Sequence, residues 1–126
     1  MRTDSYPSFR KLEVWQDGIE LVVEIYRLTE PFPAWERYGL TSQLRRAGVS
    51  VPTNIAEGYG RATRGEYLNH LSVANGSLNE VETLCVVSER LGFGHPAALT
   101  DVTSRVTSLQ KRISRMRTVL TQKKRA

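Results

Sequence analysis

Apolar residues recur every three or four positions in four segments of the chain, which predicts four amphipathic helices. The segments span about 12–28, 38–57, 63–92 and 96–120, and short runs rich in Gly and Pro separate them. No segment alternates apolar and polar residues with period two, so no strand is predicted. The pattern favours an all-α fold, an antiparallel up-and-down four-helix bundle.

The first segment carries an apolar stripe that we assign to the core. Its members are Leu12, Trp15, Ile19, Val22, Val23 and Tyr26. Leu21 and Ile25 lie outside this stripe, as Val86 and Val87 lie outside the stripe of the third segment. Left uncovered, these four residues would form exposed apolar patches, so we expect the protein to be a homo-oligomer.

The second segment has its own apolar stripe, formed by Leu40, Leu44, Ala47, Val51 and Ile55. Pro52 lies inside this helix and is expected to kink it, because proline lacks a backbone donor and crowds the preceding turn. Gly58 and Gly60 are expected to end the helix, since glycine tolerates the left-handed conformation of a C-cap.

A polar stripe lies beside this apolar one, and small or polar residues occur partway along the third segment. These residues are Gln43, Ser50, Asn54 and Glu57, with Gly76, Ser77 and Glu80. Polar groups so near a core must be hydrogen-bonded. They form either a binding site or a network that fixes the register of helices or subunits. We expect Asn54 and Glu57 to be buried and hydrogen-bonded.

The third helix is expected to begin at Thr63, because Thr63 and Glu66 have the spacing of a capping box. Its apolar stripe is Tyr67, Leu71, Ala74, Leu78, Val81, Leu84 and Leu91. Cys85 follows this side, so a packed thiol is favoured over a nucleophile. The fourth stripe is Leu99, Val102, Val106, Leu109, Ile113, Met116 and Leu120.

Length and composition are those of one globular domain over residues 1–126, with a basic tail at about 121–126. The single cysteine excludes an intrachain disulfide and fits the reducing cytoplasm. Asp4 falls where a signal peptide would be apolar, and no uncharged apolar run approaches the length of a membrane span. We therefore expect a cytoplasmic protein that does not enter a membrane.

The net charge of +5 is concentrated at one end. Residues 1–100 hold ten Lys and Arg against twelve Asp and Glu, whereas residues 101–126 hold eight against Asp101 alone. The eight cations are Arg105, Lys111, Arg112, Arg115, Arg117, Lys123, Lys124 and Arg125. This density is typical of a phosphate-binding surface, although a solvated helix face gives the same pattern. A second cluster comprises Arg45, Arg46, Arg61 and Arg64.

Residues that could support catalysis are few. His70 lies four residues after Glu66 on one helix face, but the chain has one other histidine, His95, and no second acid–histidine motif. GxGxxG, phosphate-loop and CxxC motifs are missing from the sequence. We expect no enzymatic activity, no catalytic residue, no metal and no cofactor.

Several of these residues together resemble a known family, the four-helix-bundle proteins encoded in intervening sequences of bacterial 23S ribosomal RNA genes. Phe9 to Trp15 resembles the family's opening, and the match is strongest over the second helix. The matching positions are Pro33, Glu36, Tyr38, Gly39, Leu40, Gln43, Leu44, Arg45, Arg46, Ala47, Ser50, Pro52, Asn54, Ile55, Ala56, Glu57, Gly58, Gly60, Arg61, Gly76, Ser77, Glu80 and Glu82. The resemblance covers about 8–92, and Gly48 departs from it because the family more often has alanine there.

The resemblance implies a four-helix bundle that assembles as a ring-like homopentamer, in a family without established enzymatic activity. The chain is more distantly similar to the accessory variability protein of diversity-generating retroelements, a basic pentamer that engages nucleic acid and a reverse transcriptase. We therefore expect an oligomer that binds RNA or DNA phosphates through the eight cations of residues 101–126. The alternative is an interaction or assembly scaffold without a nucleic-acid role, in which the signature residues of the second and third helices serve assembly.

Overall fold

The computed structural model describes residues 8–125, and side chains as far as residue 122. These residues form four helices and no strand, which confirms the predicted all-α class. The helices are α1 (Glu13–Thr29), α2 (Leu40–Tyr59), α3 (Arg64–Arg90) and α4 (Pro96–Arg125). Two short 3-10 turns, η1 (Phe9–Lys11) and η2 (Ala34–Glu36), precede α1 and α2.

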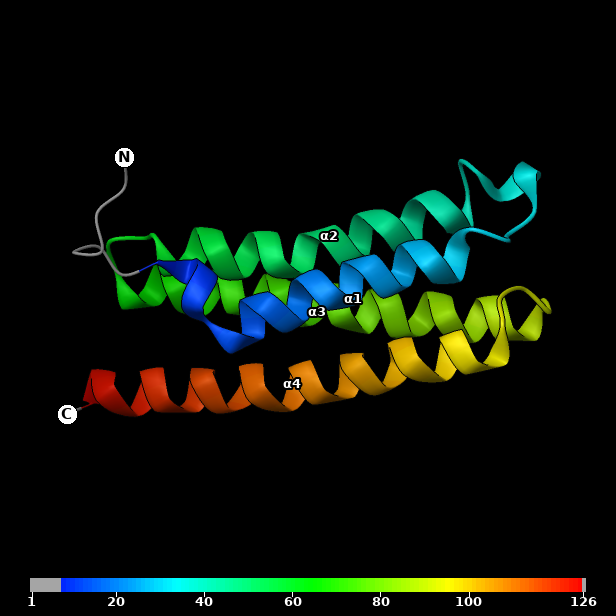
Figure 1. Cartoon of the computed structure of the whole chain (residues 1–126). Coiled ribbons are helices and arrows are strands. Elements are labelled where there is room, and N and C mark those ends of the chain that lie inside the picture. Colours follow the sequence, from blue (N-terminus) through cyan, green and yellow to red (C-terminus); the bar gives the residue numbers. More distant parts are fainter. Residues whose placement is uncertain (1–7, 126) are drawn as a thin grey trace.

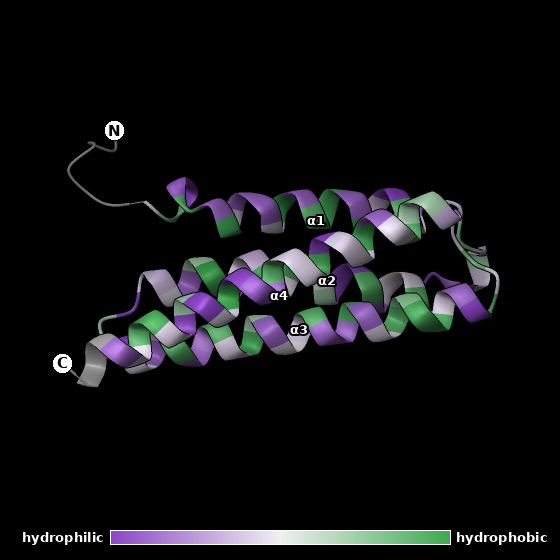
Figure 2. Ribbon diagram, turned by 90° about the horizontal axis from the view of Figure 1, so that it is seen from below, coloured by the Kyte–Doolittle hydropathy of each residue, from purple (hydrophilic) through white to green (hydrophobic). Residues whose placement is uncertain are grey.

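The four helices lie side by side, and the connections between successive helices are at alternate ends (Figure 1). Helix α1 packs against α2 and α4, and α3 packs against the same two helices. Within the described part of the chain, α1 and α3 therefore lie on one diagonal of the bundle and α2 and α4 on the other. Hydrophobic and hydrophilic residues alternate in bands along each helix, as expected when only one side of a helix is buried (Figure 2).

The core contains the apolar stripes predicted for α2, α3 and α4. The buried members are Leu40, Leu44, Ala47, Val51, Ile55, Leu71, Ala74, Leu78, Val81, Leu99, Val102, Val106, Leu109 and Ile113. Met116 and Leu120 pack against this core while partly exposed. Leu91 was wrongly included, because it lies beyond the last turn of α3 and is exposed.

The core face predicted for α1 is only partly right, because Leu12 and Trp15 pack against the core while the most buried residues lie on another face. The buried residues of this helix include Leu21 and Ile25, both fully inaccessible to solvent, with Val14, Gly18 and Leu28. Ile19 and Tyr26, assigned to the core from the sequence, are exposed. The error arises because α1 has two apolar faces with helical spacing, and the spacing alone does not identify the face that is turned inward.

The ends of α3 are as predicted. The Thr63 hydroxyl accepts a hydrogen bond from the backbone N–H of Glu66, 3.1 Å away, and Gly92 takes a positive φ of 77° just after the helix. The end of α2 differs, because Gly60 has a φ of −84° and Gly58 is a buried residue within the helix. A Cβ atom on Gly58 would lie 2.7 Å from the Cβ of His70, so glycine here permits the close approach of α2 and α3.

Candidate functional site

A ladder of four polar side chains joins α2 to α3. The Ser77 hydroxyl donates to the Ser50 hydroxyl over 2.8 Å, and the Asn54 amide donates to that same Ser50 oxygen over 3.0 Å. The Asn54 amide also donates to the Ser50 carbonyl. At the other end of the ladder, Asn54 Oδ1 lies 3.0 Å from Nδ1 of His70. Because Asn54 Oδ1 is an acceptor, Nδ1 of His70 carries the proton in this bond.

The ladder partly matches the polar stripe predicted from the sequence. Asn54 is half-buried and hydrogen-bonded, and Ser77 is buried beside Ser50. The expected burial of Glu57 is wrong: its carboxylate is exposed and lies 4.0 Å from the guanidinium of Arg61. The signature positions Gln43, Gly76 and Glu80 are exposed as well. The contact between Asn54 and His70 was missed, because it depends on the relative axial position of two helices.

The arginine cluster around α2 does not form one cationic surface. The Arg45 Nε donates to the Thr29 hydroxyl over 2.9 Å, and its guanidinium lies 4.3 Å from the centre of the Tyr26 ring. Arg61 lies near the Glu57 carboxylate, whereas no described residue of the cluster forms a salt bridge with Glu36. The Glu36 carboxylate instead accepts a hydrogen bond from the backbone N–H of Leu40, in the first turn of α2. Arg46 and Arg64 are exposed.

Two arginines of α4 are ion-paired within the chain. The Arg105 Nε donates to Asp101 over 3.0 Å, and the guanidinium of Arg112 pairs with Asp17 on α1. The hydrogen bond to Asp101 is the main cause that raises the pKa of Arg105, and the negative charges of Asp101, Glu24 and Glu20 raise it further. The acidic side of α1 thus neutralises part of the basic helix.

The other predicted cations of α4 divide into three groups. Lys111 and Arg115 are exposed and form no salt bridge with any side chain that the structure describes. Arg117 is half-buried, and its Nε has no hydrogen-bond partner among those side chains. The side chains of Lys123, Lys124 and Arg125 lie outside the described residues.

A hollow of about 510 Å³ lies on α4 beside the two unpaired cations. Its lining consists of three hydroxyl residues and three cations: Ser104, Thr107, Ser108, Lys111, Arg112 and Arg115. Hydroxyls and cations together are suited to bind oxyanions such as phosphate.

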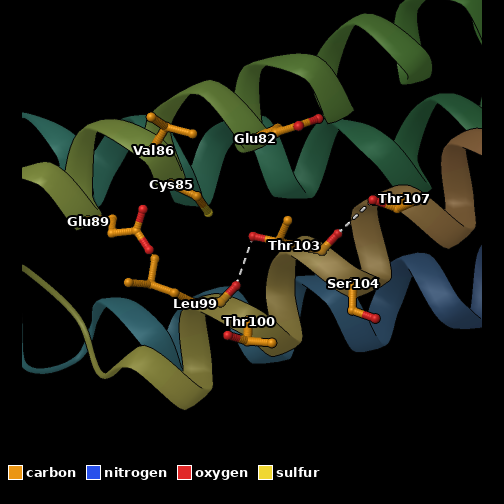
Figure 3. A pocket seen from close by; sticks show the side chains of 9 residues that line it. All are labelled: Glu82, Cys85, Val86, Glu89, Leu99, Thr100, Thr103, Ser104 and Thr107. Atoms are coloured by element: carbon orange, nitrogen blue, oxygen red, sulfur yellow. Dashed lines mark hydrogen bonds between the residues drawn. The ribbon is translucent and has the colours of Figure 1, made fainter.

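A second hollow, of about 420 Å³, lies between α3 and α4 (Figure 3). Cys85 lines it and is buried, as predicted. Burial and the nearby charge of Glu82 raise the pKa of this thiol to about 11, so it is protonated at neutral pH. Within the described part of the chain, no three His, Cys, Asp or Glu side chains are grouped as a metal site would require. None of the described helices is both long and apolar enough to span a membrane.

Comparisons with known proteins identify relatives of this bundle. The model of the family described as 23S rRNA-intervening sequence protein matches residues 10–115. A crystal structure of a protein of unknown function, from the S23 ribosomal protein family of Bacteroides thetaiotaomicron VPI-5482, superposes with a TM-score of 0.73. The two sequences are 21% identical, and the match covers 82% of this chain and 96% of the other, which shows a shared fold. No curated protein sequence matches the chain.

Proposed function

The chain belongs to the 23S rRNA-intervening sequence protein family, and from this membership we propose that it is a non-enzymatic oligomer that binds nucleic acid. The ligand we propose is the phosphate backbone of RNA or DNA, bound through the basic surface of α4. The observation that carries the proposal is the position of Lys111 and Arg115. Both are exposed on α4 without a carboxylate partner among the described side chains, in the segment that holds the chain's excess of positive charge.

Electrostatic binding of this kind makes a quantitative prediction for the unmodified protein. Each phosphate contact releases condensed counterions, so the logarithm of the affinity falls linearly with the logarithm of the salt concentration, by about 0.9 per contact on duplex DNA and 0.7 on single strands. Fluorescence anisotropy with labelled RNA and DNA, measured over a series of NaCl concentrations, gives this slope. Absence of binding to both nucleic acids at low salt would refute the proposal.

The second candidate function is assembly without nucleic acid. It is supported by exposed apolar residues on two helices: Ile19 and Tyr26 on α1, which flank the half-buried Val22 and Val23, and Val73, Val86 and Val87 on α3. Leu21 and Ile25 no longer support assembly, because they are core residues. Since α1 and α3 lie on a diagonal, contacts between α1 of one subunit and α3 of the next would be head-to-tail, and such contacts form a ring, such as a pentamer, when the rotation between subunits closes.

Light scattering after gel filtration tests this assembly, and a monomeric mass at micromolar concentration would argue against it. A protein that forms a ring but shows no salt-dependent binding would favour the scaffold over the nucleic-acid function. We further propose that the single domain is an antiparallel up-and-down bundle with α2 kinked at Pro52. We also propose that it acts in the cytoplasm, where a nucleic-acid enzyme such as a reverse transcriptase is a candidate partner.

A further inference from the structure

The hollow on α4 contains a row of donors along one helix face. Ser104, Ser108, Lys111 and Arg115 are spaced by four, three and four residues, so successive members lie one turn apart. With a rise of about 1.5 Å per residue, Lys111 and Arg115 are about 6 Å apart along the axis, and the whole row spans about 16 Å. Such a row can follow an extended polyanion along the helix.

The hydroxyls of this row differ from their neighbours in hydrogen bonding. Thr103 and Thr107 donate their hydroxyl protons to the carbonyls of Leu99 and Thr103, over 2.9 and 3.1 Å (Figure 3). Ser104 and Ser108 are exposed, and their hydroxyls make no hydrogen bond with the residues that the structure describes. Their hydroxyl protons are therefore available to a ligand.

The cations of the hollow differ in the same way. Arg112 lines the hollow, but its guanidinium is held by Asp17. Lys111 and Arg115 are not paired with any carboxylate described. The hollow is thus lined by two hydroxyls without a hydrogen-bond partner and two cations without a salt bridge among the described residues. No aromatic ring lines it.

We propose that this hollow is a phosphate subsite, in which Ser104 and Ser108 donate hydrogen bonds to phosphate oxygens while Lys111 and Arg115 supply the charge. This inference rests on the proposed function and assigns it a location. The ligand is the phosphodiester backbone rather than the bases, because stacking requires aromatic rings that the hollow lacks. The subsite consequently has no sequence preference.

Three double variants test the subsite by anisotropy with a short mixed-sequence single-stranded RNA, at NaCl concentrations of about 50 to 200 mM. Lys111→Gln with Arg115→Gln is expected to lower the salt slope by about 1.4 per bound subunit, because two contacts are lost. Arg27→Gln with Arg61→Gln is the matched control. It also removes two positive charges, but from arginines outside α4 that are paired with Glu24 and Glu57, so the slope is expected to stay unchanged.

The third variant, Ser104→Ala with Ser108→Ala, separates a built subsite from a diffuse positive surface. It is expected to weaken binding by about tenfold or more for each hydrogen bond lost, without changing the salt slope, because no charge is removed. Alanine favours the helix more than serine does, so the fold is retained, and circular dichroism checks this.

The outcomes distinguish a failure of the subsite assignment from a failure of the proposed nucleic-acid function. If the parent protein binds but the lysine–arginine variant behaves like its control, or the serine variant binds as tightly as the parent, the hollow is not the subsite. The broader proposal then stands. If the parent protein does not bind RNA, the subsite assignment and the proposed nucleic-acid function both fail. If the lysine–arginine variant loses binding of inorganic phosphate while its RNA binding matches that of the control, the hollow is a site for free phosphate and the assignment to the backbone is overturned.

Discussion

Gly48 and Ile25 meet where α1 and α2 pack, and this contact supports a prediction about core packing. Both residues are buried, and a Cβ atom on Gly48 would lie 2.6 Å from Cδ1 of Ile25. Gly48 is also the position at which the chain departs from the alanine more usual in the resembling family. The structure offers a physical reason, because the terminal methyl of Ile25 occupies the space that an alanine side chain would need.

The substitutions Gly48→Ala and Ile25→Val should therefore compensate each other. Gly48→Ala gains about 1 kcal/mol of helix propensity but overpacks the core, which costs about 1–3 kcal/mol. Ile25→Val removes the Cδ1 atom that would clash, at a cost of about 0.5–1.5 kcal/mol for the void. In the double variant the new methyl occupies this void, so the free energy of unfolding should return to within about 1 kcal/mol of the parent.

Urea unfolding of the parent, the two single variants and the double variant measures this coupling. The expected interaction energy is favourable by about 1–3 kcal/mol, with unchanged denaturant slopes. If Gly48→Ala alone is stabilising and its effect adds to that of Ile25→Val, the two side chains do not compete for the same space and the predicted coupling is wrong.

Three further predictions test the fold and the site. Leu21→Ala should cost about 2–5 kcal/mol of unfolding free energy and Val22→Ala less than about 1, and equal losses would contradict the core face assigned to α1. Asn54→Leu should cost about 1–3 kcal/mol in urea unfolding, because it leaves His70 without its partner and removes one of two donors to the Ser50 hydroxyl, and an unchanged midpoint would count against the ladder. Because the pKa of Cys85 is raised to about 11, alkylation of the folded protein should accelerate with pH until about that value, and a plateau near pH 9 would contradict the raised pKa.

The sequence predicts helices with a single apolar face better than it predicts α1. In α2 the residues from Leu40 to Ile55 have only one apolar stripe, so the inward face is determined by periodicity. In α1, Leu21 lies on one apolar face and Val22 on another, and only packing against the neighbouring helices selects between them. The spacing of apolar residues therefore identifies the buried face of a helix when its other faces are polar, and it fails to do so when two faces are apolar.

The sequence predicted most residues of the candidate site, but not their ion pairs or their grouping around one hollow. The basic residues of α4 are evident from the sequence, whereas the pairing of Arg112 with Asp17 joins helices at opposite ends of the chain. The hydroxyl row was missed, although Ser104 and Ser108 have the same helical spacing as the cations that follow them. The combination of Ser or Thr with Lys or Arg at intervals of three or four was the available signal.

Because acidic residues pair with Arg105 and Arg112 of α4, the net charge of the chain overstates the positive charge available to the proposed polyanionic ligand. Arg112 is already in place on the wall of the hollow, and the carboxylate that neutralises it belongs to Asp17 on another helix. A single substitution that removes this carboxylate would expose a preformed cation without altering any residue of the binding surface. Substitutions in α1 could therefore change the affinity for this ligand during evolution. Homologues with identical basic helices need not bind it with the same affinity.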